Sequence, residues 1–419
     1  MSITVTTLPN GLRVMTDRMT TVETVSLGAW VDVGTRHEPV EINGISHLLE
    51  HMAFKGTQRR SAAAIAEEIE NVGGHLNAYT SRENTAYYAK VLKEDSALAV
   101  DLIADILQHS VFDAEELARE QSVVVQEINQ AEDTPDDIVY DHFQATAYPD
   151  QAMGRAVLGT PERVRGITRD TLSRFMRDTY STRSMVLAAA GNIDHDTFVR
   201  LVENQFTALP QTAPVQPEVA RYTGGDLRVE KDLEQLHLLV GFDGVSYEHP
   251  LFYASAVLST LLGGGMSSRL FQEIREKRGL AYSVYTYTSS YTDGGLFGVY
   301  AGTGEDEAAE LVPVLCTELR RVLDGISPAE LARARAQIKA GLLMGLESPS
   351  NRCEQLARHI LSYGRILSTE ELVAQVEAVD AAKVLEAAAL MLNSAPTVTA
   401  LGPQSGLPDA DGFRALLAG

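Results

Sequence analysis

A segment rich in proline and glycine, LPQTAPVQPEVARYTGG at residues 209–225, divides this 419-residue chain almost in half. It shows no sustained hydrophobic period, which is typical of a linker. A chain of this length exceeds one ordinary hydrophobic core, so two domains of roughly 200 residues each are expected. We therefore predict a first domain at residues 1–208, a linker at 209–226 and a second domain at 227–419.

The two halves show the same order of strand and helix patterns. In the first half, alternation at 24–34 precedes a helical stretch at about 45–54, two strands at 75–81 and 84–92, and further helices. In the second half, a strand at 235–242 precedes a helix at 250–262, aromatic strands and long helices. We predict an α+β fold made of two homologous domains, each a mixed β-sheet covered by helices.

Composition restricts the classes of partner. The net charge of −22 repels phosphates and argues against nucleic-acid binding; it is compatible with cationic peptides, or it simply keeps the protein soluble. Cys316 and Cys353 are the only cysteines, too few for a disulfide framework, so we expect buried thiols in a reducing compartment. With no signal peptide or transmembrane pattern recognised, we expect a cytoplasmic protein with no membrane partner.

A histidine motif lies in the helix predicted at about 45–54. In His47-Leu48-Leu49-Glu50-His51, the two histidines stack one helical turn apart on one face, with Glu50 beside them. Two such imidazoles can hold zinc, and a carboxylate that is not a ligand can take a proton from the bound water. The HxxEH order is the inverzincin signature. The alternative is an exposed helix with scattered polar residues.

A second helix, predicted from Asp113 to about Asp133, offers a third ligand. Glu120 and Glu127 lie two turns apart on the edge of its apolar stripe, which consists of Leu117, Val124, Ile128 and Ala131. Burying an unpaired charge costs several kcal/mol, so inward-facing carboxylates suggest a cation or a metal-bound histidine nearby. The alternative is a pair of partly exposed acids at the margin of the stripe.

The sequence resembles the M16, or pitrilysin-type, metallopeptidases, and within them the half-length chains of the mitochondrial processing peptidase group (M16B). HLLEH, the preceding GISH, the following MAFKGT and a glutamate 76 residues after the second histidine carry this resemblance over essentially the whole chain. It implies a pitrilysin/LuxS-like fold, half of a clamshell, with one Zn²⁺ per chain. The implied ligands are His47, His51 and Glu127, with Glu50 as general base and Glu120 supporting the site.

The resemblance also implies substrate-binding residues. Asn77 and Ala78, in HLNAYTS, match positions that pair with an extended substrate at a sheet edge. Arg275 and Tyr282, in FQEIREKRGLAYSV, match a pair that donates hydrogen bonds to the substrate carbonyl or backbone. From the residues alone, these positions are an ordinary paired strand, a cation on a helix surface and an aromatic residue of a strand.

These observations predict a zinc-dependent endopeptidase that cleaves peptides or unfolded presequence-like segments, using zinc-activated water with Glu50 as general base. We expect a homodimer in which Arg275 and Tyr282 complete the partner's site. The alternatives are a non-catalytic assembly subunit like the core proteins of respiratory complexes, half of a heterodimeric peptidase, and a peptide-binding protein without hydrolysis. The glycines at 263–265 lack a Gly-Lys-Ser/Thr sequence, so we expect a flexible loop there and no nucleotide site.

Overall fold

The computed structural model describes residues 2–418 and contains two compact units, neither of which is continuous in sequence. Among these residues, the first unit comprises 2–130, 155–218 and 344–366, and the second comprises 131–154, 219–343 and 367–418. The domains expected at 1–208 and 227–419 are continuous, and the units differ from them because each takes a helix from the other half of the chain.

The first unit contains a six-stranded sheet in the order β1-β2-β6-β3-β5-β4. The β2–β6 pair is parallel and the other pairs are antiparallel. The bounds are β1 Ser2–Thr7, β2 Arg13–Arg18, β3 Thr24–Val31, β4 His75–Thr80, β5 Thr85–Leu92 and β6 Met185–Gly191. Because β4 is the last strand in this order, one of its edges lies at the border of the sheet.

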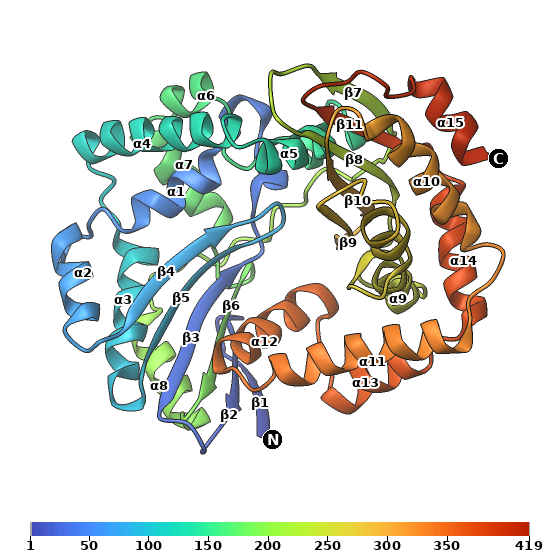
Figure 1. Ribbon diagram of the computed structural model, residues 1–419. Coiled ribbons are helices and arrows are strands. Elements are labelled where there is room, and N and C mark those ends of the chain that lie inside the picture. Colours follow the sequence, from blue (N-terminus) through green and yellow to red (C-terminus); the bar gives the residue numbers. More distant parts are fainter. Residues whose placement is uncertain (1, 419) are drawn as a thin grey trace. The chain divides into compact units, whose positions relative to one another are not determined.

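Helices cover both faces of this sheet (Figure 1). On one face, α1, α3 and α8 pack against it, whereas α12 packs on the opposite face against β6, β3 and β2. Strand β6 is buried on both faces, which explains its apolar sequence MVLAAAG. Leu187 and Ala189 enter the first core, while Val186 and Ala188 contact the core beneath α12. The helices of this unit are α1 Ile45–Ala53, α2 Ala62–Glu70, α3 Ser96–His109, α4 Ala114–Glu132, α6 Pro161–Gly166, α7 Arg169–Thr179, α8 His195–Gln205 and α12 Pro349–Tyr363.

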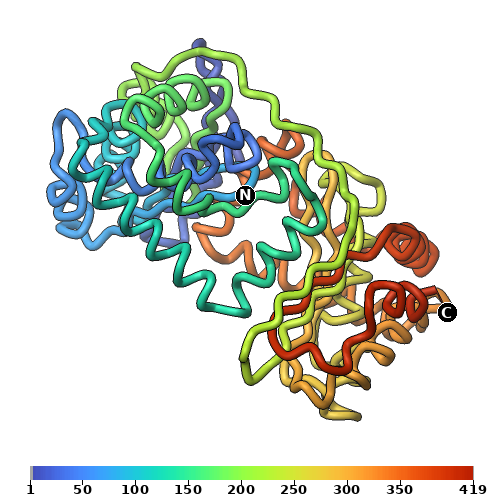
Figure 2. Tube along the Cα trace, turned by 90° about the horizontal axis from the view of Figure 1, so that it is seen from above, coloured from blue at the N-terminus to red at the C-terminus, as the bar shows by residue number. Residues whose placement is uncertain are grey.

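The second unit contains a five-stranded sheet in the order β7-β11-β8-β10-β9. Its strands are β7 Gly225–Val229, β8 Leu236–Asp243, β9 Ser283–Ser290, β10 Gly295–Thr303 and β11 Thr397–Leu401. Figure 2 shows β7 and β11 side by side, although they lie far apart in the sequence; this pair is parallel. The sequence patterns did not reveal β7 or β11.

Helix α5, Pro135–Ala147, packs on one face of this sheet, and α9 and α14 pack on the other. The close approach of α5 needs Gly241, because a Cβ atom there would lie 2.3 Å from Cζ of Phe143. The remaining helices are α9 Phe252–Gly263, α10 Ala308–Arg321, α11 Pro328–Gly345, α13 Thr369–Glu377, α14 Ala381–Leu392 and α15 Ala410–Ala418, together with a π-helical turn, η5 Phe271–Glu276.

The two sheets share one topology. The pairs β2–β6 and β7–β11 are parallel, and each is followed by the same three antiparallel pairings. The third helix after β5 is α5 and the third after β10 is α12, so these two equivalent helices are exchanged between the units. The predicted α+β fold of two related mixed sheets is confirmed.

Between α8 and β7 the chain forms neither helix nor strand. Both cysteines are buried free thiols, as expected. Within residues 2–418, none of the helices combines the length and the apolar character needed to cross a membrane.

Candidate metal centre

Helix α1 carries both motif histidines. It follows Gly44, whose φ of 97° lies in the left-handed region that favours glycine. One side of the helix is fully buried in the first core through Ile45, Leu48, Leu49 and Met52. This anchoring leaves His47, Glu50 and His51 together on the other side, each half-buried, as the helical spacing predicted.

Helix α4 brings the two predicted carboxylates to these histidines. Its start is fixed by Asp113, whose Oδ1 accepts hydrogen bonds from the backbone N–H groups of Glu115 and Glu116. Its apolar stripe enters the first core, so Glu120 is buried and Glu127 is half-buried on the same side. Both acids therefore lie on the side of α4 that carries its buried apolar residues, where Glu120 faces His51 and Glu127 faces both histidines.

Three side chains converge in a geometry that suits zinc. Glu127 Oε2 lies 3.7 Å from His47 Nε2 and 3.6 Å from His51 Nε2. Tetrahedral zinc with bonds of about 2.0–2.1 Å holds its ligand atoms roughly 3.3 Å apart, so these separations fit one shared ion better than direct hydrogen bonds. Within residues 2–418, His47, His51 and Glu127 are the one group of three His, Cys, Asp or Glu side chains that could hold a metal ion.

Glu120 supports the site from behind His51. Its Oε2 lies 3.0 Å from His51 Nδ1, and its Oε1 lies 2.6 Å from Nζ of Lys55. Burial opposes ionisation of Glu120, but the hydrogen bonds from Lys55 and His51 outweigh it and hold the pKa of this carboxyl below its usual value. Glu120 is therefore an ionised partner of His51 that leaves Nε2 free to face Glu127.

The ionisation states of His47 and Glu50 also suit metal chemistry. Burial, assisted by the neighbouring His51, lowers the pKa of His47 to about 4, so its imidazole is neutral and able to ligate at neutral pH. Burial raises the pKa of Glu50, although Thr80 Oγ1 donates a hydrogen bond to its Oε2 at 2.6 Å. A carboxylate with a raised pKa is a stronger base than an ordinary glutamate.

Lys55 and Thr80 were not singled out in the sequence. Lys55 lies four residues beyond His51, in MAFKGT, and Thr80 is the last residue of β4, in HLNAYTS. The sequence around them gives little indication of a functional role, because a lysine after a helix and a threonine in a strand are ordinary surface residues. Their roles emerge only once α4 and β4 are placed beside α1.

Asn77 and Ala78 lie on β4, at the border of the first sheet. The backbone N–H of Ala78 donates to Oδ1 of Asn77 at 2.8 Å. This N–H is thus capped by a neighbouring side chain instead of another strand, and a peptide carbonyl could replace that acceptor. The structure thereby brings a strand edge near the metal centre, with Thr80 of the same strand bound to Glu50.

Arg275 and Tyr282 lie in the second unit, which does not contain the metal centre. The Arg275 guanidinium carbon is 4.7 Å from the ring centroid of Tyr282 and 4.9 Å from that of Phe271. Tyr282 is 75% exposed. The structure therefore brings this predicted pair together as an exposed cation–aromatic contact.

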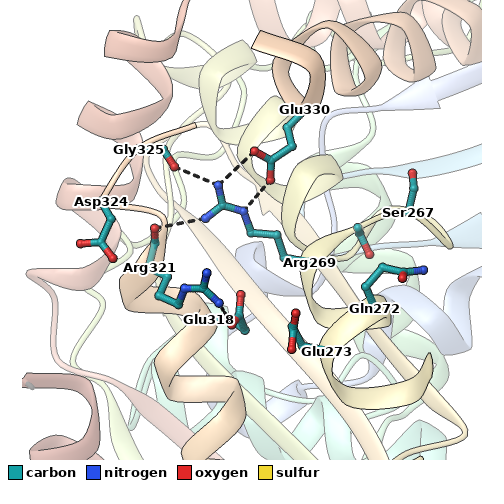
Figure 3. Close-up of a pocket in the computed structure, with 10 residues that line it drawn as sticks. Ser267, Arg269, Gln272, Glu273, Glu318, Arg321, Asp324, Gly325 and Glu330 are labelled. Atoms are coloured by element: carbon teal, nitrogen blue, oxygen red, sulfur yellow. Dashed lines mark hydrogen bonds and ion pairs between the residues drawn. The ribbon is translucent and has the colours of Figure 1, made fainter. Parts of the chain in front are cut away.

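The loop that follows the glycines at 263–265 does not hold a free cation for phosphate (Figure 3). Arg269 donates hydrogen bonds to Glu330, at 2.7 and 3.3 Å, and to the carbonyl oxygens of Arg321 and Gly325. The surrounding pocket also contains Glu273, Glu318 and Asp324. An arginine occupied in this way, among acids, disfavours an anion site.

Comparisons with known proteins show the family of the chain. The family model described as Insulinase (Peptidase family M16) matches residues 13–161, and the model described as Peptidase M16 inactive domain matches residues 166–338. An uncharacterized zinc protease of Rickettsia bellii is 40% identical over 96% of this chain and 98% of its own. The probable mitochondrial-processing peptidase subunit beta of Arabidopsis thaliana is 40% identical over 98% of this chain and 80% of its own.

Solved structures show the same fold. A Helicobacter pylori protease superposes with a TM-score of 0.89 at 22% identity, covering 96% of this chain and 99% of its own. A chain from complex III2 of Candida albicans superposes with a TM-score of 0.87 at 22% identity, covering 99% of this chain and 100% of its own.

The fold and the His-His-Glu group define a metallopeptidase class of protein. The chain belongs to peptidase family M16, and its relatives include proteins named as zinc proteases. The resemblance seen in the sequence is confirmed.

Proposed function

We propose that this protein is a zinc-dependent endopeptidase that cleaves extended peptides. The observation that carries the proposal is the convergence of both histidine Nε2 atoms on one oxygen of Glu127. Glu50 interacts electrostatically with His51 and Glu127, and it is not one of the three possible ligands. A zinc ion held there would supply a Lewis acid that polarises the scissile carbonyl and lowers the pKa of water.

The side chains around the zinc ligands transfer the proton and keep the reacting groups in position. Glu50 accepts a proton from the attacking water and returns it to the leaving amine, while Thr80 fixes its Oε2 and leaves Oε1 for proton transfer. His51 keeps its orientation because Glu120 and Lys55 hold its Nδ1 side. The pKa of Glu50, raised by burial, brings this base closer to the working pH.

The substrate lies along β4 as an added strand. The border position of β4 and the Ala78 N–H that rests on Asn77 support this placement, since both leave backbone groups open to an extended chain. Arg275 and Tyr282 supply donors to the substrate carbonyl or backbone. We expect them to act on the partner's site in a homodimer, and acidic composition would favour cationic peptides.

A non-catalytic assembly role is the second candidate, because the fold is also that of a chain in complex III2. The complete donor set favours hydrolysis, since an assembly subunit has no need of two histidines that face one carboxylate, with His47 kept neutral by burial. A heterodimeric peptidase would share the chemistry and differ only in its partner.

The test is product mapping on a mixed peptide library with zinc-loaded wild type and Glu50→Gln, together with zinc quantification. We expect Glu50→Gln to keep its zinc and to lose about 10²–10⁴-fold in turnover. Glu67→Gln, which changes an exposed glutamate on α2, is the matched control and should keep full activity. Full activity of Glu50→Gln, or no cleavage by the zinc-loaded wild type, would refute the proposal.

A further inference from the structure

An apolar pocket of about 360 Å³ lies in the first unit, on the sheet face that carries α12. Helix α12 packs chiefly on β6, β3 and β2, so its first turns form a side wall and β5 and β4 extend the floor. Three lining residues, His75, Asn77 and Tyr79, belong to the border strand β4. Of the lining residues, Asn77 alone has a proposed role, and that role concerns the strand edge of β4 and not the pocket.

Its walls are aromatic and held in place. Trp30, Tyr79 and Tyr88 line it, with the two tyrosine ring centroids 6.2 Å apart. One carboxylate fixes two of these rings: Glu354 accepts a hydrogen bond from Trp30 Nε1 at 3.0 Å and another from the Tyr79 hydroxyl at 2.5 Å. Because both oxygens of Glu354 already have a donor, the pocket presents aromatic carbon more than free charge.

The pocket continues the substrate edge. Along β4, alternate residues face opposite sides: Ala78 enters the first core and Thr80 bonds to Glu50, whereas Asn77 and Tyr79 line the pocket. A peptide strand added to β4 alternates in the same way, so every second side chain emerges on the pocket side. Asn77 is three residues from Thr80, or roughly 10 Å along the strand.

We propose that this pocket binds a large apolar, preferably aromatic, side chain of the substrate, about two to four residues from the scissile bond. The proposal rests on the proposed function, in that the peptide lies along β4. It assigns the specificity of the enzyme partly to Trp30 and Tyr88, which no ligand or base role involves, and partly to the exchanged helix α12, which forms one wall.

The chain's only tryptophan, Trp30, lines the pocket and reports its occupancy. Peptides without tryptophan, each carrying Ala, Leu, Phe or Arg at one varied position, are titrated into zinc-loaded Glu50→Gln protein while Trp30 emission is followed. At one position we expect Phe to bind about tenfold more tightly than Ala and to change the emission. Tyr88→Ala in the same protein should reduce that preference several-fold.

Two further variants test whether a loss of the preference for Phe peptides comes from the pocket itself. Leu92→Ala removes an exposed apolar side chain from the same strand, outside the pocket lining, and should leave the preference unchanged. Asn351→Phe, at an exposed lining position on α12, should block the pocket and weaken Phe peptides selectively even if Tyr88→Ala folds poorly.

Each outcome decides between the two proposals. Peptides that leave Trp30 emission unchanged, or a Phe preference that neither Tyr88→Ala nor Asn351→Phe reduces, would overturn the pocket while cleavage by wild type still supports the peptidase. A preference for Arg that Glu354→Gln abolishes would also overturn it, in favour of a cation site. Pocket-dependent binding without any cleavage by wild type would support the pocket and refute the peptidase.

Discussion

Glu120 Oε2 lies 3.0 Å from Nδ1 of His51, on the opposite side of the ring from the Nε2 atom that faces Glu127. An ionised carboxylate in this position selects the tautomer with its proton on Nδ1 and leaves the Nε2 lone pair for a metal. Lys55, 2.6 Å from the other oxygen of Glu120, keeps that carboxylate charged. The orientation of one zinc ligand thus depends on two side chains that do not ligate.

Glu120→Gln should weaken zinc binding by about 10–100-fold, because the amide no longer supplies a charged acceptor to His51. Chelator competition measures the change. Glu115→Gln, at an exposed position on the same helix, is the control and should bind zinc like wild type. Wild-type affinity in Glu120→Gln would show that His51 needs no such partner.

Glu127→Ala should lose more zinc affinity than Glu120→Gln, since it removes a direct ligand and leaves only two histidines. Metal analysis after dialysis against a weak chelator is the measurement, with circular dichroism to confirm folding. If Glu127→Ala retained stoichiometric zinc while Glu120→Gln lost it, the ligand assignment of the two acids would have to be reversed.

Mixing two inactive variants tests whether Arg275 and Tyr282 act across a dimer. Glu50→Gln lacks the base, and the double variant Arg275→Ala/Tyr282→Phe lacks the donors. If the donors act in trans, randomly mixed dimers should recover about a quarter of wild-type kcat/KM, because half the dimers are mixed and each has one complete site. No recovery after verified subunit exchange would place the donors in cis, and an active double variant before mixing would assign them no catalytic role.

The Arg269–Glu330 pair should make stability depend on pH (Figure 3). Burial opposes ionisation of Glu330, but hydrogen bonds from Arg269 and Ser327 outweigh it and hold its pKa at about 2. A lowered pKa stabilises the fold above the ordinary value of 4.5, and this contribution disappears as the pH falls toward 2. Glu330→Gln should therefore lower the free energy of unfolding by roughly 2 kcal/mol at pH 7.

Urea unfolding of wild type and Glu330→Gln between pH 7 and pH 3, followed for the transition of the second unit, measures this difference. The difference in the free energy of unfolding between wild type and Glu330→Gln should stay constant down to about pH 5 and then become smaller. Glu310→Gln, an exposed glutamate on α10, is the control with no expected gap. A gap that does not change with pH would mean that the glutamate stabilises by packing alone.

The side chains of the candidate metal centre could be proposed from the sequence because helical periodicity is a local property of each helix. Helical periodicity alone places His47, Glu50 and His51 on one face of α1, and a carboxylate at the edge of an apolar stripe marks Glu120 and Glu127 on α4. Choosing between the two acids required a resemblance to a family, since their positions on the stripe are equivalent. Lys55 escaped notice because its partner is 65 residues away on another helix.

The exchange of helices could not be predicted in the same way. The apolar residues Cys353, Leu356, Ala357 and Ile360 of α12 repeat at helical spacing and show that one face is buried. Periodicity says nothing about which sheet receives that face, and proximity in sequence favours the wrong one. The pocket beside α12 could not be predicted for the same reason, because Trp30 and Glu354 come into contact only when α12 packs on the first sheet.

The exchanged helix α12 also affects when the first unit can complete its folding during synthesis. The first sheet is complete in sequence at Gly191, but the helix that covers its Trp30 face ends at Tyr363. At ordinary translation speeds the roughly 170 intervening residues take on the order of 10 to 30 s to emerge. If the first sheet forms as soon as it has emerged, we expect its apolar Trp30 face to stay uncovered until α12 follows.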